Sequence, residues 1–274
     1  MIRRQSSTRK SVDYCRHSPA LFIGLTFAAI CLIVGAPAVS IAADQAPIDR
    51  TAATPMPVNP GRPHASSSDP HRQLSPQKLL QVALQHKNEG RPAEAFRTLT
   101  MAINRYPDEG GLYAVRGSLY LETGQYATAL QDLERAVALN PDDAAALTNR
   151  AQTYRQFGRE KEAMQDLERA VEISPNLIPA LFNRGALRYS QADLEGAKED
   201  FDRCIAADPH MPAPYFNRAA VFEAMDQRAA AIADIERFIS IADNDAWKHQ
   251  AEELLKVWRQ GAQVDREGAK PDSN

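Results

Sequence analysis

A 34-residue period runs through most of this chain, from about Pro76 to Asp245. The stretches GQYATALQDLERAVALNPDD (124–143) and GREKEAMQDLERAVEISPNL (158–177) align residue for residue at that offset. A fixed period of this length predicts a solenoid, in which each repeat packs against its neighbours and no single central core forms. The repeat therefore constrains the fold, whereas it says little about what the surface binds.

The repeats come into register when Pro141 and Pro175 occupy position 32 of their repeats. Position 8 is then always Gly or Ala, position 20 is always Ala, and positions 4 and 24 are large and apolar. Gly124 and Gly158 lie at mid-repeat, where a first helix can end in a left-handed residue. Proline stops a second helix because it lacks the N–H and clashes with the preceding turn. Each repeat is thus predicted to form helix, turn and helix.

This order of large, small and proline positions resembles the tetratricopeptide repeat (TPR) family. The resemblance implies an all-α fold, an α-solenoid of about five helix-turn-helix repeats followed by a C-terminal capping helix. The predicted repeats are 76–109, 110–143, 144–177, 178–211 and 212–245. The last repeats depart from the pattern, with Ala192 and Asp226 in place of the mid-repeat glycine and Asp243 in place of the proline. Terminal repeats are expected to be atypical.

A second pattern couples arginine at position 7 with aspartate at position 23 in repeats two to five. Repeat one lacks both residues and has Val82 and Thr98 instead. We expect a structural ion pair between the two helices of a hairpin, or across to the next hairpin, and not a catalytic group. The expected pairs are Arg116 with Asp132, Arg150 with Asp166, Arg184 with Asp200, and Arg218 with Asp234.

The N-terminal 43 residues have the order of a bacterial secretory signal. Five basic residues and one acidic residue precede the uncharged stretch ALFIGLTFAAICLIV (20–34), and small residues follow up to Ala42 and Ala43. The sequence favours cleavage near Ala42 or Ala43. The alternative is an uncleaved signal anchor, because the uncharged run is long enough to span a bilayer. Either reading predicts a periplasmic or secreted protein, or repeats held in the periplasm by an inner-membrane anchor.

The segments that flank the repeats have their own compositions. Residues 44–74 are rich in Pro, Ala and Ser without apolar periodicity, so we expect a disordered linker. In residues 246–260, Trp247, Ala251 and Trp258 fall on one face of a helix that can cap the stack, with Asn244 or Asp245 as its N-cap. Residues 261–274 are polar and are expected to form a flexible tail.

Charge and reactive residues exclude several classes of function. Without the leader the net charge is about −7, which argues against nucleic-acid binding. Only Cys204 remains outside the leader, so no intramolecular disulfide can form, and a small core residue is its expected role. The chain has no Cys-x-x-Cys, no phosphate-binding glycine loop and no histidine pair with metal-ligand spacing on a helix. We therefore expect no metal, no cofactor and no enzymatic activity.

The TPR resemblance implies a concave groove lined by positions 5, 6, 9, 12 and 13 of each first helix. The large rings at Phe182, Tyr189 and Phe216 are the expected anchors. Replacing Phe182 and Phe216 together by alanine should weaken binding and leave the melting temperature nearly unchanged. The rings can also pack partly against a neighbouring helix. The predicted partner-binding residues are Ala114, Ser118, Leu121, Thr148, Asn149, Gln152, Arg155, Phe182, Asn183, Ala186, Tyr189, Phe216, Asn217, Ala220 and Glu223.

Together these features predict a non-catalytic scaffold or adaptor of the bacterial cell envelope. Its partners would be one or more proteins that place a peptide or a helix in the groove, with no nucleic acid and with membrane contact only through an uncleaved N-terminal segment. Two alternatives stay open. One is a self-assembling envelope protein whose contacts come from Phe238 and the closing helix, and the other is a regulatory subunit of an envelope enzyme.

Overall fold

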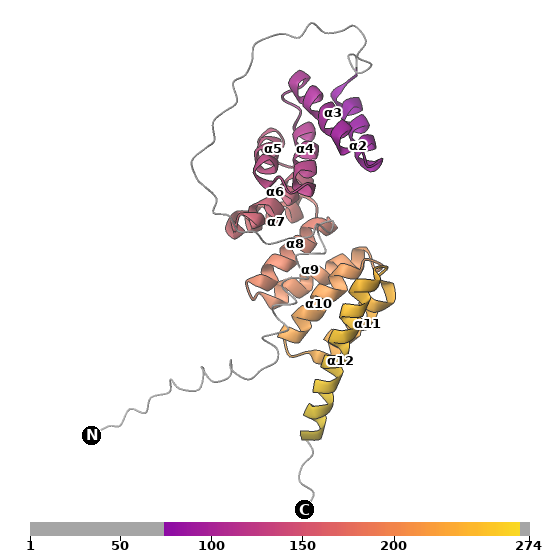
Figure 1. Ribbon diagram of the computed structural model, residues 1–274. Coiled ribbons are helices and arrows are strands. Elements are labelled where there is room, and N and C mark those ends of the chain that lie inside the picture. Colours follow the sequence, from indigo (N-terminus) through magenta and orange to yellow (C-terminus); the bar gives the residue numbers. More distant parts are fainter. Residues whose placement is uncertain (1–73, 269–274) are drawn as a thin grey trace, which may run out of the picture.

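The computed structural model describes residues 74–268, and all of the regular structure within that range is helical (Figure 1). The predicted leader (1–43), all but the last residue of the predicted linker (44–74) and residues 269–274 lie outside the described residues. The helices are α2 (Pro76–Asn88), α3 (Pro92–Arg105), α4 (Gly110–Glu122), α5 (Tyr126–Leu139), α6 (Ala144–Gln156), α7 (Glu160–Ile173), α8 (Ile178–Ser190), α9 (Leu194–Ala207), α10 (Pro212–Ala224), α11 (Arg228–Ile241) and α12 (Asp245–Gly268).

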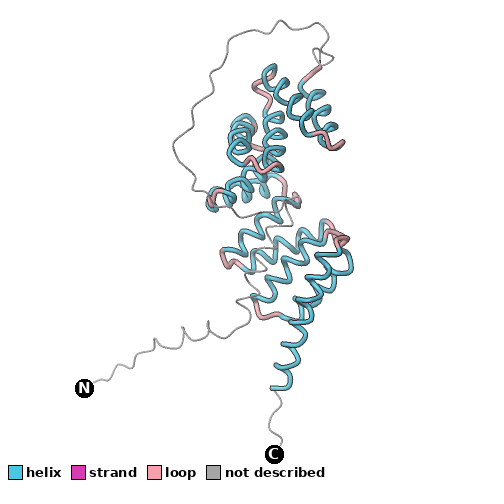
Figure 2. Tube along the Cα trace, in the orientation of Figure 1, coloured by secondary structure: helices cyan, strands magenta, loops and turns pink. Residues whose placement is uncertain are grey.

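Consecutive helices pair into five antiparallel hairpins, and α12 follows the last of them (Figure 2). The predicted all-α solenoid with a closing helix is confirmed. The main contacts between helices join members of one hairpin or of neighbouring hairpins, so the stack extends from α2 and α3 at one end to α12 at the other (Figure 1). Stability in such a stack depends on each hairpin and on each junction with its neighbour.

Every hairpin turn contains one residue in the left-handed region. Gly90, Gly124 and Gly158 have φ of 69°, 74° and 68°, and Ala192 and Asp226 follow them at 62° and 59°. At each turn the amide of the next residue donates to a carbonyl five residues earlier, as Gln125 N does to Tyr120 O at 2.8 Å. These bonds satisfy carbonyls that the helix end would otherwise leave without a partner. The turn geometry is therefore the same in the two hairpins that lack glycine.

Small residues let the two helices of each hairpin approach closely. A Cβ on Gly117 would lie 2.8 Å from Leu133 Cγ, and a Cβ on Gly185 would lie 3.0 Å from the Phe201 ring. Alanine fills position 20 of every repeat with no exposed surface, as at Ala163. The large residues at position 24 fill the space that remains, and all five are buried. This packing is the physical basis of the pattern seen in the sequence.

The last helix, α12, closes the C-terminal end. The Asn244 side chain accepts from the Trp247 amide at 3.0 Å and caps the helix. Ala251, Leu255 and Trp258 are buried in one cluster with residues of α10 and α11. The helix continues to Gly268, eight residues beyond the predicted end at 260, so the predicted flexible tail begins too early. The reason is that residues 262–267 (AQVDRE) include good helix formers, and one glycine at 261 lowers helix stability without ending the helix.

Candidate functional site

An arginine on the first helix of each hairpin from α4 onward pairs with an aspartate on the second helix. Nε and Nη2 of each arginine donate to the two carboxylate oxygens, at 2.6–2.9 Å. The aspartates are 0–7 % exposed. All four pairs lie within a hairpin, which decides between the two arrangements left open by the sequence. They are Arg116–Asp132, Arg150–Asp166, Arg184–Asp200 and Arg218–Asp234.

The acid at position 25 of the preceding repeat helps to raise the pKa of the arginine in three of these pairs, those of Arg150, Arg184 and Arg218. Hydrogen bonding to Asp166 raises the pKa of Arg150 against the opposing effect of burial, and Glu134 contributes a smaller Coulombic effect in the same direction. For Arg218, burial lowers the pKa, but hydrogen bonds to Asp234 and to Asp202 outweigh it and raise it above its ordinary value. The arginines therefore stay charged, and the carboxylates offset the cost of burying them.

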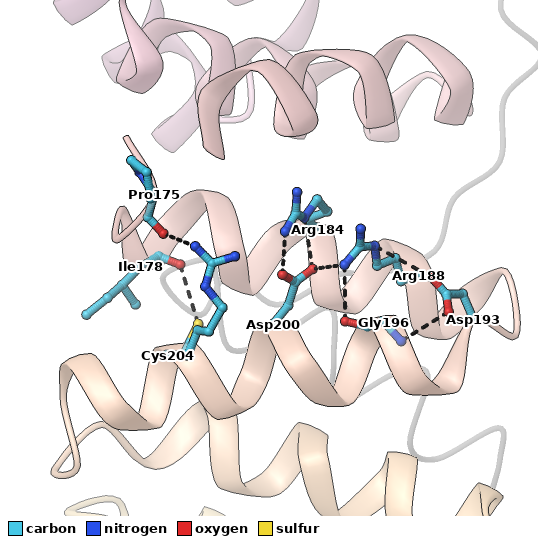
Figure 3. Close-up of polar contacts among 9 residues, drawn as sticks. Pro175, Ile178, Arg184, Arg188, Asp193, Gly196, Asp200 and Cys204 are labelled. Atoms are coloured by element: carbon cyan, nitrogen blue, oxygen red, sulfur yellow. Dashed lines mark hydrogen bonds and ion pairs between the residues drawn. The ribbon is translucent and has the colours of Figure 1, made fainter. Parts of the chain in front are cut away.

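The hairpin of α8 and α9 has the most extensive of these networks (Figure 3). Asp200 accepts from Arg184 and also from Arg188 Nη1 at 2.9 Å. Arg188 donates as well to the carbonyl oxygen of Gly196 at 3.2 Å and lies 3.6 Å from an oxygen of Asp193. The charged groups of this network pair with one another inside the hairpin, which is the arrangement of a structural clamp and leaves no group oriented for chemistry.

The first helices of the hairpins lie side by side and form one continuous face of the stack. The Lys87 ammonium of α2 lies 2.5 Å from a carboxylate oxygen of Glu122 on α4, and the contacts of α6 with α4 and α8 continue the row. Side chains of these helices that the hairpin cores leave half-buried or exposed define what we call the first-helix face. It comprises Leu80, Leu84, Ser118, Leu121, Asn149, Gln152, Arg155, Phe182, Asn183, Ala186, Tyr189 and Glu223.

Several predicted groove residues lie on this face with their polar groups engaged locally. Ser118 donates to the Val115 carbonyl at 3.1 Å, and the Asn183 amide donates to the Pro179 carbonyl at 2.9 Å. Glu223 forms an ion pair with Arg228 at 2.8 Å. The carbonyl oxygen of the Asn183 side chain can still accept from a partner backbone. Leu121, Asn149, Gln152, Arg155 and Ala186 are also half-buried on this face.

The three predicted anchor rings differ in burial. Phe182 is half-buried, with its ring edge-on to Phe201 at 5.8 Å between centroids, and Tyr189 is half-buried between the clusters of the last two hairpins. Phe216 is only 3 % exposed and packs against Phe238 at 5.2 Å. A strip of three accessible rings is therefore not present, because the third ring belongs to the C-terminal core.

Four more predicted groove residues are buried as well. Asn217 and Ala220 share the first helix of the last hairpin with Phe216, in the region where α12 contributes to the same core cluster. Ala114 is buried against α5 and α6, and the hydroxyl of buried Thr148 donates to the Ala144 carbonyl at 2.7 Å. These residues pack between helices, so they cannot contact a partner in this conformation.

Two accessible residues at the N-terminal end were not among the predicted set. Leu80 and Leu84 occupy positions 5 and 9 of repeat one, and Leu84 is 38 % exposed. Leu80 approaches Gly111 at the start of α4, which places this stripe of α2 on the first-helix face. The sequence could have identified both leucines, because they occupy in repeat one the same positions that were used to choose groove residues in the later repeats.

Comparison with known proteins identifies the repeat. Sequence models described as tetratricopeptide repeat match residues 79–109, 115–178 and 178–211, which together span the first four hairpins. The chain belongs to the tetratricopeptide repeat (TPR) family. TPR stacks generally act as scaffolds for protein–protein interaction, which agrees with a face of side chains that the core does not use.

Solved structures of TPR proteins share the fold. A thermophilic TPR protein of Thermus thermophilus matches with a TM-score of 0.53 at 17 % identity, over 68 % of this chain and all of that chain. A TPR protein of Parabacteroides merdae matches with a TM-score of 0.55 at 24 % identity, over 73 % and 76 %. YrrB, described as having an unusual peptide-binding site, matches with a TM-score of 0.52 at 18 % identity, over 65 % and 92 %. No curated protein matches the sequence.

The described part of this TPR chain offers few groups for chemistry. Cys204 is buried, its Sγ lies 3.7 Å from the Ile178 carbonyl oxygen, and burial raises the pKa of the thiol to about 12. Between residues 74 and 268 no three His, Cys, Asp or Glu side chains are grouped to hold a metal ion. None of the described helices is long and apolar enough to span a bilayer. The expectation that the chain is not an enzyme stays a prediction.

Proposed function

We propose that this chain is a non-catalytic adaptor of the bacterial cell envelope that binds a peptide or helical segment of a partner protein on its first-helix face. The observation that supports the proposal is the row of side chains along five neighbouring helices that the hairpin cores do not bury. Leu84 and Leu121 offer aliphatic surface at one end, Asn149 and Gln152 offer amides in the middle, and Tyr189 offers a ring farther along. Apolar anchors beside backbone-binding amides suit an extended or helical segment.

We propose that the anchor lies closer to the N-terminal hairpins than the sequence suggested. Phe216 belongs to the core, whereas Leu84 is among the most exposed of the large apolar side chains in the described part of the chain. YrrB, a protein of similar fold, is described as having a peptide-binding site, which is consistent with this use of a TPR stack. A partner segment with aliphatic residues spaced for Leu84 and Leu121 fits the face best.

A direct test selects peptides from a random display library and measures their affinity for the protein and for a double variant, Leu84→Gln with Leu121→Gln. Glutamine keeps helix propensity and removes the aliphatic surface, so we expect about a tenfold or larger loss of affinity. Val257→Gln is the matched control, because Val257 is 49 % exposed on α12, a helix that contributes no side chain to this face. Equal affinity of the double variant and the control would exclude the first-helix face.

The envelope location rests on the sequence of residues 1–43, which lie outside the described residues. We propose that the leader exports the chain and is cleaved near Ala43, with an uncleaved inner-membrane anchor as the alternative. Expression in a Gram-negative bacterium, followed by fractionation and intact-mass measurement, distinguishes the two. A periplasmic protein that begins near Asp44 supports cleavage, a membrane-bound chain of full mass supports the anchor, and a full-length cytoplasmic chain contradicts both.

Two of the residues that suggested self-assembly through the closing helix are buried. Phe238 is 3 % exposed and Trp258 is 2 % exposed, and both lie in the core that joins α10, α11 and α12. The apolar surface that suggested an oligomer contact is therefore used inside one chain. The adaptor function is the one that the accessible side chains favour.

A further inference from the structure

The first hairpin has an open pocket of about 480 Å³ on the outer surface of its second helix. We call it the α3 pocket, and it is lined by Phe96, Arg97, Thr100, Met101 and Asn104. All five residues belong to α3, whereas the first-helix face is built from α2, α4, α6, α8 and α10. The pocket is therefore a separate surface from the one proposed above.

The chemistry of this surface differs from that of the later repeats. Position 25 is Thr100 in repeat one, but it is an acid in the other four repeats, and position 26 is Met101 where the others have arginine. At the junction of α9 and α10 the function of the acid is visible, because Asp202 accepts from Arg218 Nη1 at 2.5 Å. The acids at position 25 are Glu134, Glu168, Asp202 and Glu236.

At the first junction this second carboxylate is missing. Arg116 Nη1, the atom equivalent to the one that Asp202 engages on Arg218, donates instead to the Thr100 hydroxyl at 3.3 Å. Asp132 is the one carboxylate paired with Arg116 among the described side chains. Arg97 is exposed on the rim, and within the described part of the chain it forms no ion pair. The Arg97 guanidinium therefore lines the α3 pocket, and Arg116, which donates to the lining residue Thr100, has no second carboxylate partner among the described residues.

The floor of the pocket is apolar and held in place. The Phe96 ring lies 4.7 Å from the ring of Tyr120 on α4, and Met101 packs partly against the first core cluster. Both side chains remain half-buried, so each keeps some accessible apolar surface. A ring fixed by its neighbour loses little conformational entropy on binding, which favours a small apolar contact at this place.

We infer that the α3 pocket binds a segment of a partner protein in which an acidic side chain lies next to an apolar one. The carboxylate occupies the position beside Arg116 and Thr100 that Asp202 occupies beside Arg218, and it also attracts Arg97. The apolar neighbour rests on Phe96 and Met101. Charge-assisted hydrogen bonds to arginine fix the orientation of the bound segment, and the apolar contact contributes part of the affinity. This site does not depend on the proposed use of the first-helix face.

Nuclear magnetic resonance titration with short blocked peptides tests the inference. The probe is an N-acetylated, C-amidated peptide with Phe-Glu at its centre and Gly-Ser flanks, and the matched probe replaces Glu by Gln. We expect the Phe-Glu peptide to shift the Met101 methyl and the Arg97 side-chain signals with a Kd of about 1 mM, as befits a small contact. The Phe-Gln peptide should bind about tenfold more weakly, since a charge-assisted hydrogen bond is lost.

Variants of Thr100 make the test specific. Thr100→Glu supplies from within the chain the acid found in repeats two to five, so it should block the Phe-Glu peptide, whereas Thr100→Gln is neutral and should not. Arg97→Gln removes an exposed charge without affecting the core and should also weaken binding. Three results would overturn the inference: equal binding of the two peptides, unchanged binding to Thr100→Glu, or shifts confined to residues such as Leu84.

Discussion

Two residues in the hairpin turns adopt a conformation that suits glycine. Ala192 and Asp226 have φ near 60°, where a Cβ crowds the following carbonyl oxygen at a cost of roughly 1–2 kcal/mol for most residues. Aspartate tolerates this region better than alanine does. The same turn hydrogen bonds form around them as around the three glycines, so the surrounding hairpins impose the conformation.

Ala192→Gly should therefore raise the free energy of unfolding by about 0.5–1 kcal/mol, because relief of the left-handed alanine outweighs the added freedom of the unfolded chain. Asp226→Gly should give a smaller gain. Ala233→Gly is the matched control, since Ala233 is exposed in the middle of α11, and there glycine should lower stability by about the same amount. Urea unfolding followed by circular dichroism measures all three, and a loss of stability in Ala192→Gly would contradict the strain argument.

Among the four aspartates that pair with arginine, Asp200 should be the one whose substitution lowers stability most. It is 0 % exposed and accepts hydrogen bonds from both Arg184 and Arg188, so Asp200→Asn removes the paired carboxylate of Arg184 and leaves Arg188 with only the Asp193 carboxylate among the described residues, at 3.6 Å. We expect a loss of about 2–4 kcal/mol in the free energy of unfolding. Asp142→Asn, which breaks an exposed pair with Arg169, should cost less than about 1 kcal/mol. Similar losses in the two variants would mean that burial does not decide the energy of these pairs.

At the scale of elements, α10 and α12 share one core. Phe216 of α10 is buried in the cluster that contains Leu255 and Trp258 of α12, so its ring stabilises the C-terminal end. Phe216→Ala should cost about 3–4 kcal/mol and lower the melting temperature, because a buried ring leaves a cavity that the hairpin fills only in part. Phe182→Ala should cost less, since Phe182 is half-buried. Calorimetry measures both variants, and Phe157→Ala, in an exposed turn, is the control.

The hairpins could be predicted from the sequence because their determinants are local and recur every 34 residues. Glycine or its substitutes set the turns, small residues set the helix distance, and Arg184 with Asp200 repeats a pair visible elsewhere in the sequence. The accessibility of the candidate site could not be predicted in the same way. Phe216 is buried against Phe238 of α11, a ring at a position that is small in the other repeats, in a cluster that α12 completes without repeat symmetry.

At the scale of the whole molecule, the N-terminal end of the stack is closed by polar residues. Position 10 is buried in repeats two to five, as at Leu119 and Leu187, but in repeat one it is exposed Gln85. Lys78 is likewise exposed where later repeats bury position 3. The C-terminal end is less polar, because α12 exposes Val257 (49 %) one turn after exposed Glu253. At positions 3 and 10 the first repeat therefore lacks the apolar residues that pack against a preceding repeat, as expected of a terminal repeat.

Replacing the polar residues at the N-terminal end by leucine should therefore make the protein associate with itself. Lys78→Leu with Gln85→Leu gives α2 the apolar face that α4 buries against its neighbour, and exposed apolar patches of this kind drive contact between chains. We expect the double variant to sediment with a concentration-dependent mass while the parent protein stays at one mass. Gln131→Leu with Gln165→Leu adds the same two leucines to exposed places in the middle of the stack and should leave the mass unchanged. If the parent protein associates, or if only the mid-stack variant associates, then the polar residues of α2 are not what prevents association between chains.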